Sequence, residues 1–105
     1  MGLLRHVDNA AQPLSGRRAI VLGGSGGIGR HVSFQLAEAG AHVVAHGGSD
    51  REKLATLLRD IHGRKLSAEG FLQSVRHADE LVDSVARRRP FDIAVVAFGP
   101  FLQKP

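Results

Sequence analysis

Residues 19 to 29 decide the fold, and they read Ala19-Ile20-Val21-Leu22-Gly23-Gly24-Ser25-Gly26-Gly27-Ile28-Gly29. Apolar residues run directly into a glycine-rich turn, and an amphipathic stretch follows from Arg30 to Ala39, which predicts strand, tight turn and helix. A helix N-terminus presents unpaired backbone N–H groups and the positive end of the helix dipole. Glycines lack the Cβ atoms that would keep a phosphate away from those groups. The stretch therefore predicts a loop that binds a pyrophosphate.

The spacing of the glycines separates two kinds of phosphate-binding loop. Gly24, Gly26 and Gly29 fit G-x-G-x-x-G, which is a weak signal by itself. The first and last of these also fit G-x-x-x-x-G-K-[ST], but Arg30-His31 stands where that motif needs Lys and a Mg²⁺-binding hydroxyl residue. We therefore exclude a nucleoside triphosphatase. A tight turn that packs closely and binds no ligand remains the alternative.

The stretch from Leu22 to Gly29 resembles the cofactor loop of the short-chain dehydrogenase/reductase family, which usually reads Thr-Gly-x-x-x-Gly-Ile-Gly. Here Leu22 replaces the threonine. The resemblance covers Leu14 to Pro105 and includes residues 43–49 and 92–99. In the last stretch the family usually has Asn-Asn-Ala-Gly, and this chain, with Val96-Ala97-Phe98-Gly99, keeps only the glycine.

Apolar periodicity and turn residues predict alternating strands and helices along the chain. We expect strands at 19–22, 41–46, 65–72 and 91–98. We expect helices at 27–39, 50–61 and 75–89. Ser49 and Glu52 form a predicted capping box for the second helix, and Ser74 is the candidate cap of the third.

Each predicted helix has one apolar face. In the first helix the residues expected to point inward are Ile28, Val32, Leu36 and Ala39. In the second helix they are Leu54, Leu57, Leu58 and Ile61. In the third helix they are Ala78, Leu81, Val82 and Val85.

The order β-α-β-α-β-α-β predicts a parallel sheet with right-handed crossovers. Four strands in the order 3-2-1-4 with three helices make a truncated, Rossmann-like doubly wound α/β fold, with the glycine-rich turn at its switch point. Residues 1–13 are expected to be a loose lead-in and residues 14–105 a partial dinucleotide-binding domain. A six-stranded domain needs about 150 residues, so we expect only the N-terminal, cofactor-binding half.

The resemblance implies a set of cofactor-binding residues: Gly23, Ser25, Gly26, Gly27, Ile28, Gly29, Gly47, Gly48, Ser49, Leu72, Phe98 and Gly99. The family usually has an Asp-Val pair after the third strand that contacts the adenine. Phe71-Leu72 takes that place here, so Leu72 is expected to pack on the ring without the carboxylate contact.

The end of the second strand bears on the choice of dinucleotide. An acidic residue there would accept the ribose 2′-hydroxyl of NAD(H) and repel a 2′-phosphate. That place is Gly47, while Ser49 and Arg51 just beyond are placed to meet a phosphate and Asp50 opposes it. NADP(H) is therefore favoured over NAD(H), with helix capping as the alternative role of Ser49.

The resemblance implies a parent reaction of hydride transfer between NADP(H) and a carbonyl or alcohol. The family's catalytic Ser and Tyr-x-x-x-Lys have no counterpart here, and the sequence contains no tyrosine. Of the histidines, His46 alone is predicted at the carboxyl end of a central strand, on the adenosine side. We expect no catalysis by this chain alone, and a non-catalytic dinucleotide-binding or interaction module is the alternative.

Composition narrows the remaining classes. The chain of 105 residues has no cysteine, and its six histidines lack the spacing of zinc ligands, so no metal site is expected. The net charge of +4 comes from scattered cations without Trp or Tyr, which argues against nucleic-acid binding. No apolar run of about 18 residues exists to span a membrane, so we expect a soluble, cytoplasmic protein. The last strand is expected to be an open edge through which the chain self-associates.

Overall fold

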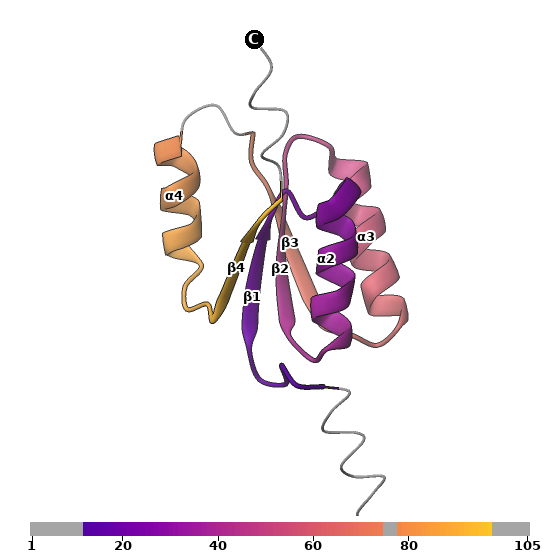
Figure 1. Cartoon of the computed structure of the whole chain (residues 1–105). Coiled ribbons are helices and arrows are strands. Elements are labelled where there is room, and N and C mark those ends of the chain that lie inside the picture. The colour runs from indigo at the N-terminus through magenta and orange to yellow at the C-terminus, as the bar shows by residue number, and fades with distance from the viewer. Residues whose placement is uncertain (1–11, 75–77, 98–105) are drawn as a thin grey trace, which may run out of the picture.

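The computed structural model describes residues 12–74 and 78–97. Strands and helices alternate along these residues as β1 (Arg18–Leu22), α2 (Gly27–Glu38), β2 (His42–Gly47), α3 (Arg51–Gly63), β3 (Ala68–Leu72), α4 (Ala78–Arg87) and β4 (Ile93–Val96). The strands pair in parallel in the order β3-β2-β1-β4 (Figure 1). This confirms the predicted Rossmann-like arrangement of four strands and three helices.

The sheet carries α2 and α3 on one face and α4 on the other (Figure 1). The main hydrophobic core lies between the sheet and the first pair of helices, where Val21 and Val43 pack with Leu57 and Ile61, all fully buried. The inward face predicted for α3 is confirmed, since Leu54 is also buried and Leu58 packs at the margin of this core.

The inward face predicted for α2 is wrong at its first turn. Ile28 is 72% exposed, whereas the buried row of α2 consists of Gly29, Ser33 and Ala37. Val32 and Leu36 contact the core only in part. At the start of this row space is limited, since a Cβ on Gly29 would lie 1.8 Å from the Gly23 oxygen and the Ser33 hydroxyl donates to the Gly24 carbonyl. The helix therefore turns its smallest residues, rather than its most apolar ones, toward the sheet.

The ends of α3 also differ from the prediction. Asp50, not Ser49, is the N-cap, and its side chain accepts the backbone N–H of Lys53 at 3.0 Å. The predicted capping box is therefore wrong, and Ser49 is an exposed residue just before the cap. At the other end the helix continues to Gly63, and Lys65 makes the turn in the left-handed region with φ of 63°. Strand β3 consequently begins only at Ala68.

The outer part of the chain is shorter in regular structure than predicted. In α4 Leu81 is buried as expected, but Val82 is 64% exposed, so its inward placement is wrong. Strand β4 spans only Ile93–Val96. Asp92 still lies beside the start of β1, where its carboxylate accepts the N–H of Arg18 at 2.9 Å. Ser74, the predicted cap of this helix, is followed by residues 75–77, which lie outside the described residues. Its capping role therefore stays a prediction.

Candidate functional site

The glycine loop, defined as residues 23–29, joins β1 to α2 at the carboxyl ends of the parallel strands (Figure 1). Gly23 and Gly27 have φ of 77° and 49°, in the left-handed region that favours glycine. A Cβ on Gly29 would lie 1.8 Å from the carbonyl oxygen of Gly23. Gly23, Gly27 and Gly29, which match the glycines of Thr-Gly-x-x-x-Gly-Ile-Gly, therefore each have a backbone reason to lack a side chain.

The N-terminus of α2 opens toward solvent at the tip of the glycine loop. Gly26 is the N-cap, with an extended φ of −132°, and it offers no side chain to accept the first helical N–H groups. The first turn of α2 contains no acidic residue. A Cβ on Gly26 would meet nothing within 4 Å. The positive end of the helix dipole thus faces open space, an arrangement that suits an anion.

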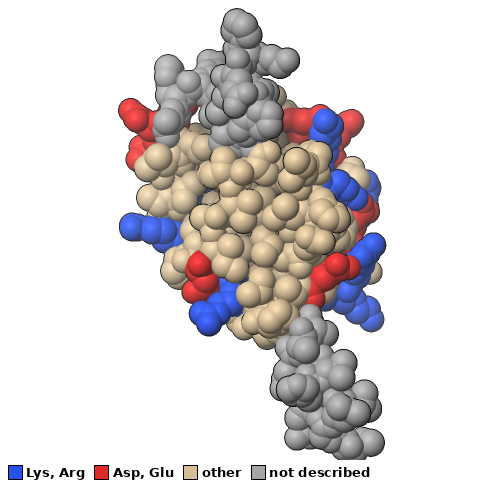
Figure 2. Space-filling view, viewed as in Figure 1, with Lys and Arg blue, Asp and Glu red and all other residues tan. Residues whose placement is uncertain are grey.

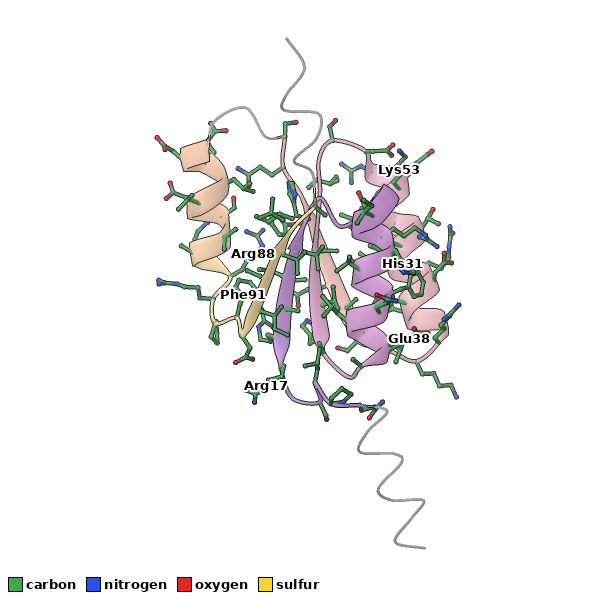
Figure 3. All side chains as sticks on the ribbon, in the orientation of Figure 1. Arg17, His31, Glu38, Lys53, Arg88 and Phe91 are labelled. Atoms are coloured by element: carbon green, nitrogen blue, oxygen red, sulfur yellow. The ribbon has the colours of Figure 1, made fainter. Side chains whose placement is uncertain are left out.

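An open pocket of about 480 Å³ lies beside this helix end. The loop contributes Ser25, Gly26 and Gly27 to its lining, and the first turns of α3 contribute Asp50, Glu52, Lys53 and Thr56. Lys53 lies at the carboxyl end of the sheet, whereas Arg17 and Glu38 lie at the opposite end (Figure 3). The pocket therefore brings the candidate phosphate loop next to the start of α3, where both charge signs are present.

Gly47 lies between the glycine loop and β3. A Cβ there would meet the Leu72 side chain at 3.2 Å and the Ser25 hydroxyl and the Leu54 side chain at 3.3 Å. Gly47 and Leu72 also pair across the strands. The structure thus brings three predicted site residues into one contact. Beyond them, a Cβ on Gly48 would meet nothing within 4 Å, and Ser49 is exposed.

His46, the last residue but one of β2, holds the start of the glycine loop. It is 1% exposed, and its Nδ1 accepts the N–H of Gly23 at 3.0 Å. Its backbone carbonyl accepts the N–H of Gly24 at 2.8 Å. Its Nε2 lies 2.8 Å from the carbonyl oxygen of Gln73, to which it donates. These partners assign the neutral tautomer with hydrogen on Nε2.

The environment of His46 favours the neutral ring. Burial lowers the pKa of His46, and the hydrogen bond to the Gln73 carbonyl opposes this effect without cancelling it. The side-chain oxygen of Gln73 in turn accepts the hydroxyl hydrogen of Ser84, a buried residue of α4. A hydrogen-bonded chain therefore runs from the glycine loop through β2 and the end of β3 to α4.

The sequence interpretation missed the partners of His46, although it placed the residue correctly at the end of a central strand. One signal was present in the sequence, because a polar residue that ends an apolar, buried strand must find hydrogen-bond partners. Gln73 could not be named as that partner, since it lies 27 residues away and depends on the register between β2 and β3.

The predicted site residues fall into two groups. Among those from the glycine loop and the ends of β2 and β3, Ser25, Gly47 and Leu72 lie in contact, and their binding roles stay predictions. Phe98 and Gly99 lie outside the described residues. Within residues 12–74 and 78–97, no group of three or more histidine or acidic side chains is placed to hold a metal ion. In the same part of the chain, no helix has both the length and the apolar character needed to cross a bilayer.

Known proteins resemble this chain over the same region. A family model described as short chain dehydrogenase matches residues 17–93. A short-chain type dehydrogenase/reductase from Picea abies is 34% identical over 87 residues, which are 83% of this chain and 32% of the relative. The 3-oxoacyl-[acyl-carrier-protein] reductase FabG of Rickettsia bellii is 46% identical over 89 residues, covering 82% of this chain and 34% of FabG. The chain thus spans about a third of the length of these relatives.

Solved structures of short-chain oxidoreductases also resemble this chain. The 3-oxoacyl (acyl-carrier-protein) reductase of Agrobacterium tumefaciens C58 with NADP bound has a TM-score of 0.70 and 30% identity, over 82% of this chain and 34% of that structure. A metagenomic short-chain oxidoreductase in complex with NADP has a TM-score of 0.65 and 32% identity, over 77% of this chain and 38% of that structure. The family model covers well over half of the sequence, and the chain belongs to the short-chain dehydrogenase/reductase family.

Proposed function

We propose that this chain binds NADP(H), with the pyrophosphate at the N-terminus of α2 and the adenosine side between the ends of β2 and β3. The observation that carries the proposal is the uncapped start of α2, where Gly26 lacks a side chain and the first turn lacks an acid. Unpaired N–H groups and the helix dipole then favour an anionic ligand at the glycine loop. Ile28, 72% exposed beside this helix end, offers apolar surface to the same ligand.

The preference for NADP(H) over NAD(H) rests on the end of β2. Gly47 brings no carboxylate to accept a ribose hydroxyl. Since Asp50 caps α3, the hydroxyl of Ser49 is not needed as the helix cap and is exposed. Arg51 and Lys53 are also exposed near this point and supply positive charge for a 2′-phosphate. The NADP-bound relatives from Agrobacterium tumefaciens and the metagenomic source favour the same choice.

A pair of substitutions at Gly26 tests the proposed binding. The Gly26→Asp and Gly26→Asn variants place side chains of almost equal size at an N-cap that has an extended backbone and open space. Both residues are good N-caps, so both variants should melt at or above the wild-type temperature. Only the aspartate puts a negative charge where the pyrophosphate would lie. By calorimetric titration we expect the Gly26→Asp variant to bind NADPH at least about tenfold more weakly than Gly26→Asn.

Equal NADPH affinity of these two folded variants, or no NADPH binding by the wild-type chain, would overturn the proposal. A parallel titration with NADH tests the preference, which requires the weaker binding of NADH. We expect the 2′-phosphate of NADPH to contact the Ser49 hydroxyl. Ser49→Ala should therefore lower NADPH affinity toward that of NADH while leaving NADH affinity unchanged.

We further propose that the reductase to whose cofactor-binding half this chain corresponds transfers hydride between NADP(H) and a carbonyl or alcohol. This chain alone is expected to catalyse no hydride transfer. Reduction of a carbonyl needs a proton donor near the developing alkoxide, and the chain contains no tyrosine. His46 is not available as that donor, because its Nε2–H is held by Gln73. NADPH consumption at 340 nm with ketones and aldehydes should therefore stay at background, whereas turnover that disappears in Gly26→Asp would contradict this.

The alternative function is a dinucleotide-binding or interaction module without chemistry. Such a module would bind a dinucleotide at the same site but would not take part in hydride transfer to a substrate. A cytoplasmic location stays a prediction from the sequence.

A further inference from the structure

We propose that His46 is the positioning residue of the glycine loop, whose neutral Nδ1 holds the Gly23 amide in the place that dinucleotide binding requires. The inference rests on the proposed function and deepens it, because it names a residue outside the loop that controls the loop's ability to bind. The residue is not in contact with the open pocket and acts through Gly23.

The first step of the argument is the double attachment of the loop to β2. His46 accepts two consecutive loop amides, that of Gly23 through Nδ1 at 3.0 Å and that of Gly24 through its carbonyl at 2.8 Å. Only the first of these bonds depends on the side chain. A single residue therefore fixes where the chain leaves β1 and begins its left-handed turn at Gly23.

The second step connects this turn to the helix that would bind the phosphate. The carbonyl of Gly23 lies so close to Gly29 that a Cβ there would be 1.8 Å from its oxygen. The position of the Gly23 peptide thus sets how closely the first turn of α2 approaches the end of β1. Displacing this peptide would move the N-terminal amides of α2, which are the proposed ligands of the pyrophosphate.

The third step concerns the protonation state of His46. The ring accepts a hydrogen bond with one nitrogen and donates with the other, so the neutral tautomer satisfies both partners. An imidazolium would direct a second N–H at the N–H of Gly23. Among the described residues, Leu22 of β1 pairs with His46, and Phe71 and Gln73 at the end of β3 contact its ring. Ser84 of α4 and Arg88, just after that helix, contact Gln73 and Phe71 in turn.

Arg88 lies 3.9 Å from the centre of the Phe71 ring, which is itself 5.3 Å from the centre of the His46 ring. Arg88, just after α4, therefore brings a positive charge to the Phe71 side of the ring. Protonation of His46 should release the Gly23 amide, because a protonated Nδ1 no longer accepts its N–H.

Two substitutions separate the two hydrogen bonds of the ring. An asparagine has its side-chain oxygen at about the position of Nδ1, so His46→Asn can still accept the Gly23 amide but cannot reach Gln73. A glutamine reaches about as far as Nε2, so His46→Gln can still bond to Gln73 but offers no acceptor to Gly23. Both variants lose one hydrogen bond and the ring contact with Phe71, which makes them matched in stability.

The measurements are NADP⁺ affinity by calorimetry at pH 7.5, the melting temperature, and hydrogen exchange of the Gly23 amide. We expect similar melting temperatures, near wild-type affinity for His46→Asn, and about a three- to tenfold loss for His46→Gln, the effect of one hydrogen bond. The Gly23 amide should exchange faster in His46→Gln only. Between pH 7.5 and 5 the wild-type affinity should fall more than that of His46→Asn, which has no group to titrate at this place.

Equal NADP⁺ affinity of the two variants, or equal protection of the Gly23 amide in both, would overturn the inference. A loss of affinity that follows melting temperature in both variants would also overturn it, because it would assign His46 a general structural role. Failure of the wild-type chain to bind NADP⁺ would instead refute the proposed function, and the exchange of the Gly23 amide would still decide whether His46 holds the loop.

Discussion

The inner strands and β4, at the edge of the sheet, share a run of Ala, Val or Ile residues but have different surroundings. Strand β1 contains Ala19, Ile20 and Val21, none more than 1% exposed, and β2 is buried from Val43 to Gly47. Strand β4 reads Ile-Ala-Val-Val and alternates half-buried with exposed residues, so that Val96 is 63% exposed. An apolar run therefore predicts a strand, whereas its burial depends on whether the strand has neighbours on both sides.

The two faces of the sheet differ in a similar way. The face under α2 and α3 contains the main core, while α4 is the helix that covers the other face among the described residues (Figure 1). In the view of Figure 2 the centre of the molecule, over β4, β1 and α2, shows no charged side chain, and the charges lie around the rim. The inner strands thus stabilise the fold, and β4 presents an apolar edge.

The largest expected effect is a core truncation on the better covered face. Leu57→Ala, at a fully buried position of α3, should reduce the free energy of unfolding by about 2–5 kcal/mol because it leaves a cavity. Val82→Ala, at the 64% exposed position of α4, should change it by less than about 0.5 kcal/mol. Urea denaturation followed by circular dichroism measures both values, and similar losses would contradict the difference in burial between these two positions.

A substitution inside the glycine loop should have the next largest effect. Gly29→Ala places a Cβ against the backbone of Gly23, so the loop must shift, at a cost of about 1–3 kcal/mol. Gly63→Ala, where a Cβ meets nothing within 4 Å, is the control at the far end of α3 and should stabilise by up to about 1 kcal/mol. A Gly29→Ala protein that melts at the wild-type temperature would show that the loop and the helix are less closely packed than described.

The effect of pH on stability is expected to be smaller and to come from the inner strands. Because the pKa of His46 is lowered in the folded chain, the unfolded chain takes up a proton below about pH 6.5 that the folded chain does not. Stability from this group is complete above that pH and falls as pH decreases toward the lowered pKa, by up to about 1.4 kcal/mol per pH unit.

His46→Asn provides the control for this pH effect, since the other titrating groups are unchanged. The difference in unfolding free energy between wild type and His46→Asn should be constant above pH 7 and shift toward the variant below it. A difference that stays constant down to pH 5 would refute the assignment.

The smallest effect on stability, but a distinct effect on association, is expected at β4. Val96→Lys puts a charge on the exposed edge strand and should reduce concentration-dependent self-association. Val82→Lys changes an equally exposed valine on α4 and should leave association unchanged. Analytical ultracentrifugation distinguishes the two, and a wild-type chain that stays monomeric at high concentration would contradict the expected edge pairing.

Strand order and the special glycines could be predicted because they follow from local rules. Gly23, Gly27 and Gly29 are required by the backbone alone, and an alternating pattern of strands and helices permits few topologies. The inward face of α2 could not be predicted from apolar spacing, since close approach to the loop selects small residues there. The cap of α3 was predicted at Ser49 and lies at Asp50, because the helix starts one residue later than the capping-box pattern indicates.

Parts of the candidate site depend on contacts that sequence spacing does not show. The bond between His46 and Gln73 requires the register of two strands, and the bond between Gln73 and Ser84 requires the position of α4. The binding roles of Phe98 and Gly99 stay predictions. The sequence therefore predicts the loop that would hold a ligand better than the residues that hold the loop.

The enclosure of Gly47 has a consequence for redesigning cofactor preference. A carboxylate introduced at this position would start from a Cβ already at 3.2 Å from Leu72 and 3.3 Å from Ser25, so Gly47→Asp would disturb the loop that it was meant to serve. A Cβ on Gly48 would meet nothing within 4 Å. An attempt to convert this chain toward NAD(H) should therefore begin with Gly48→Asp, which adds the acid one residue further along and leaves the contact between loop and sheet intact.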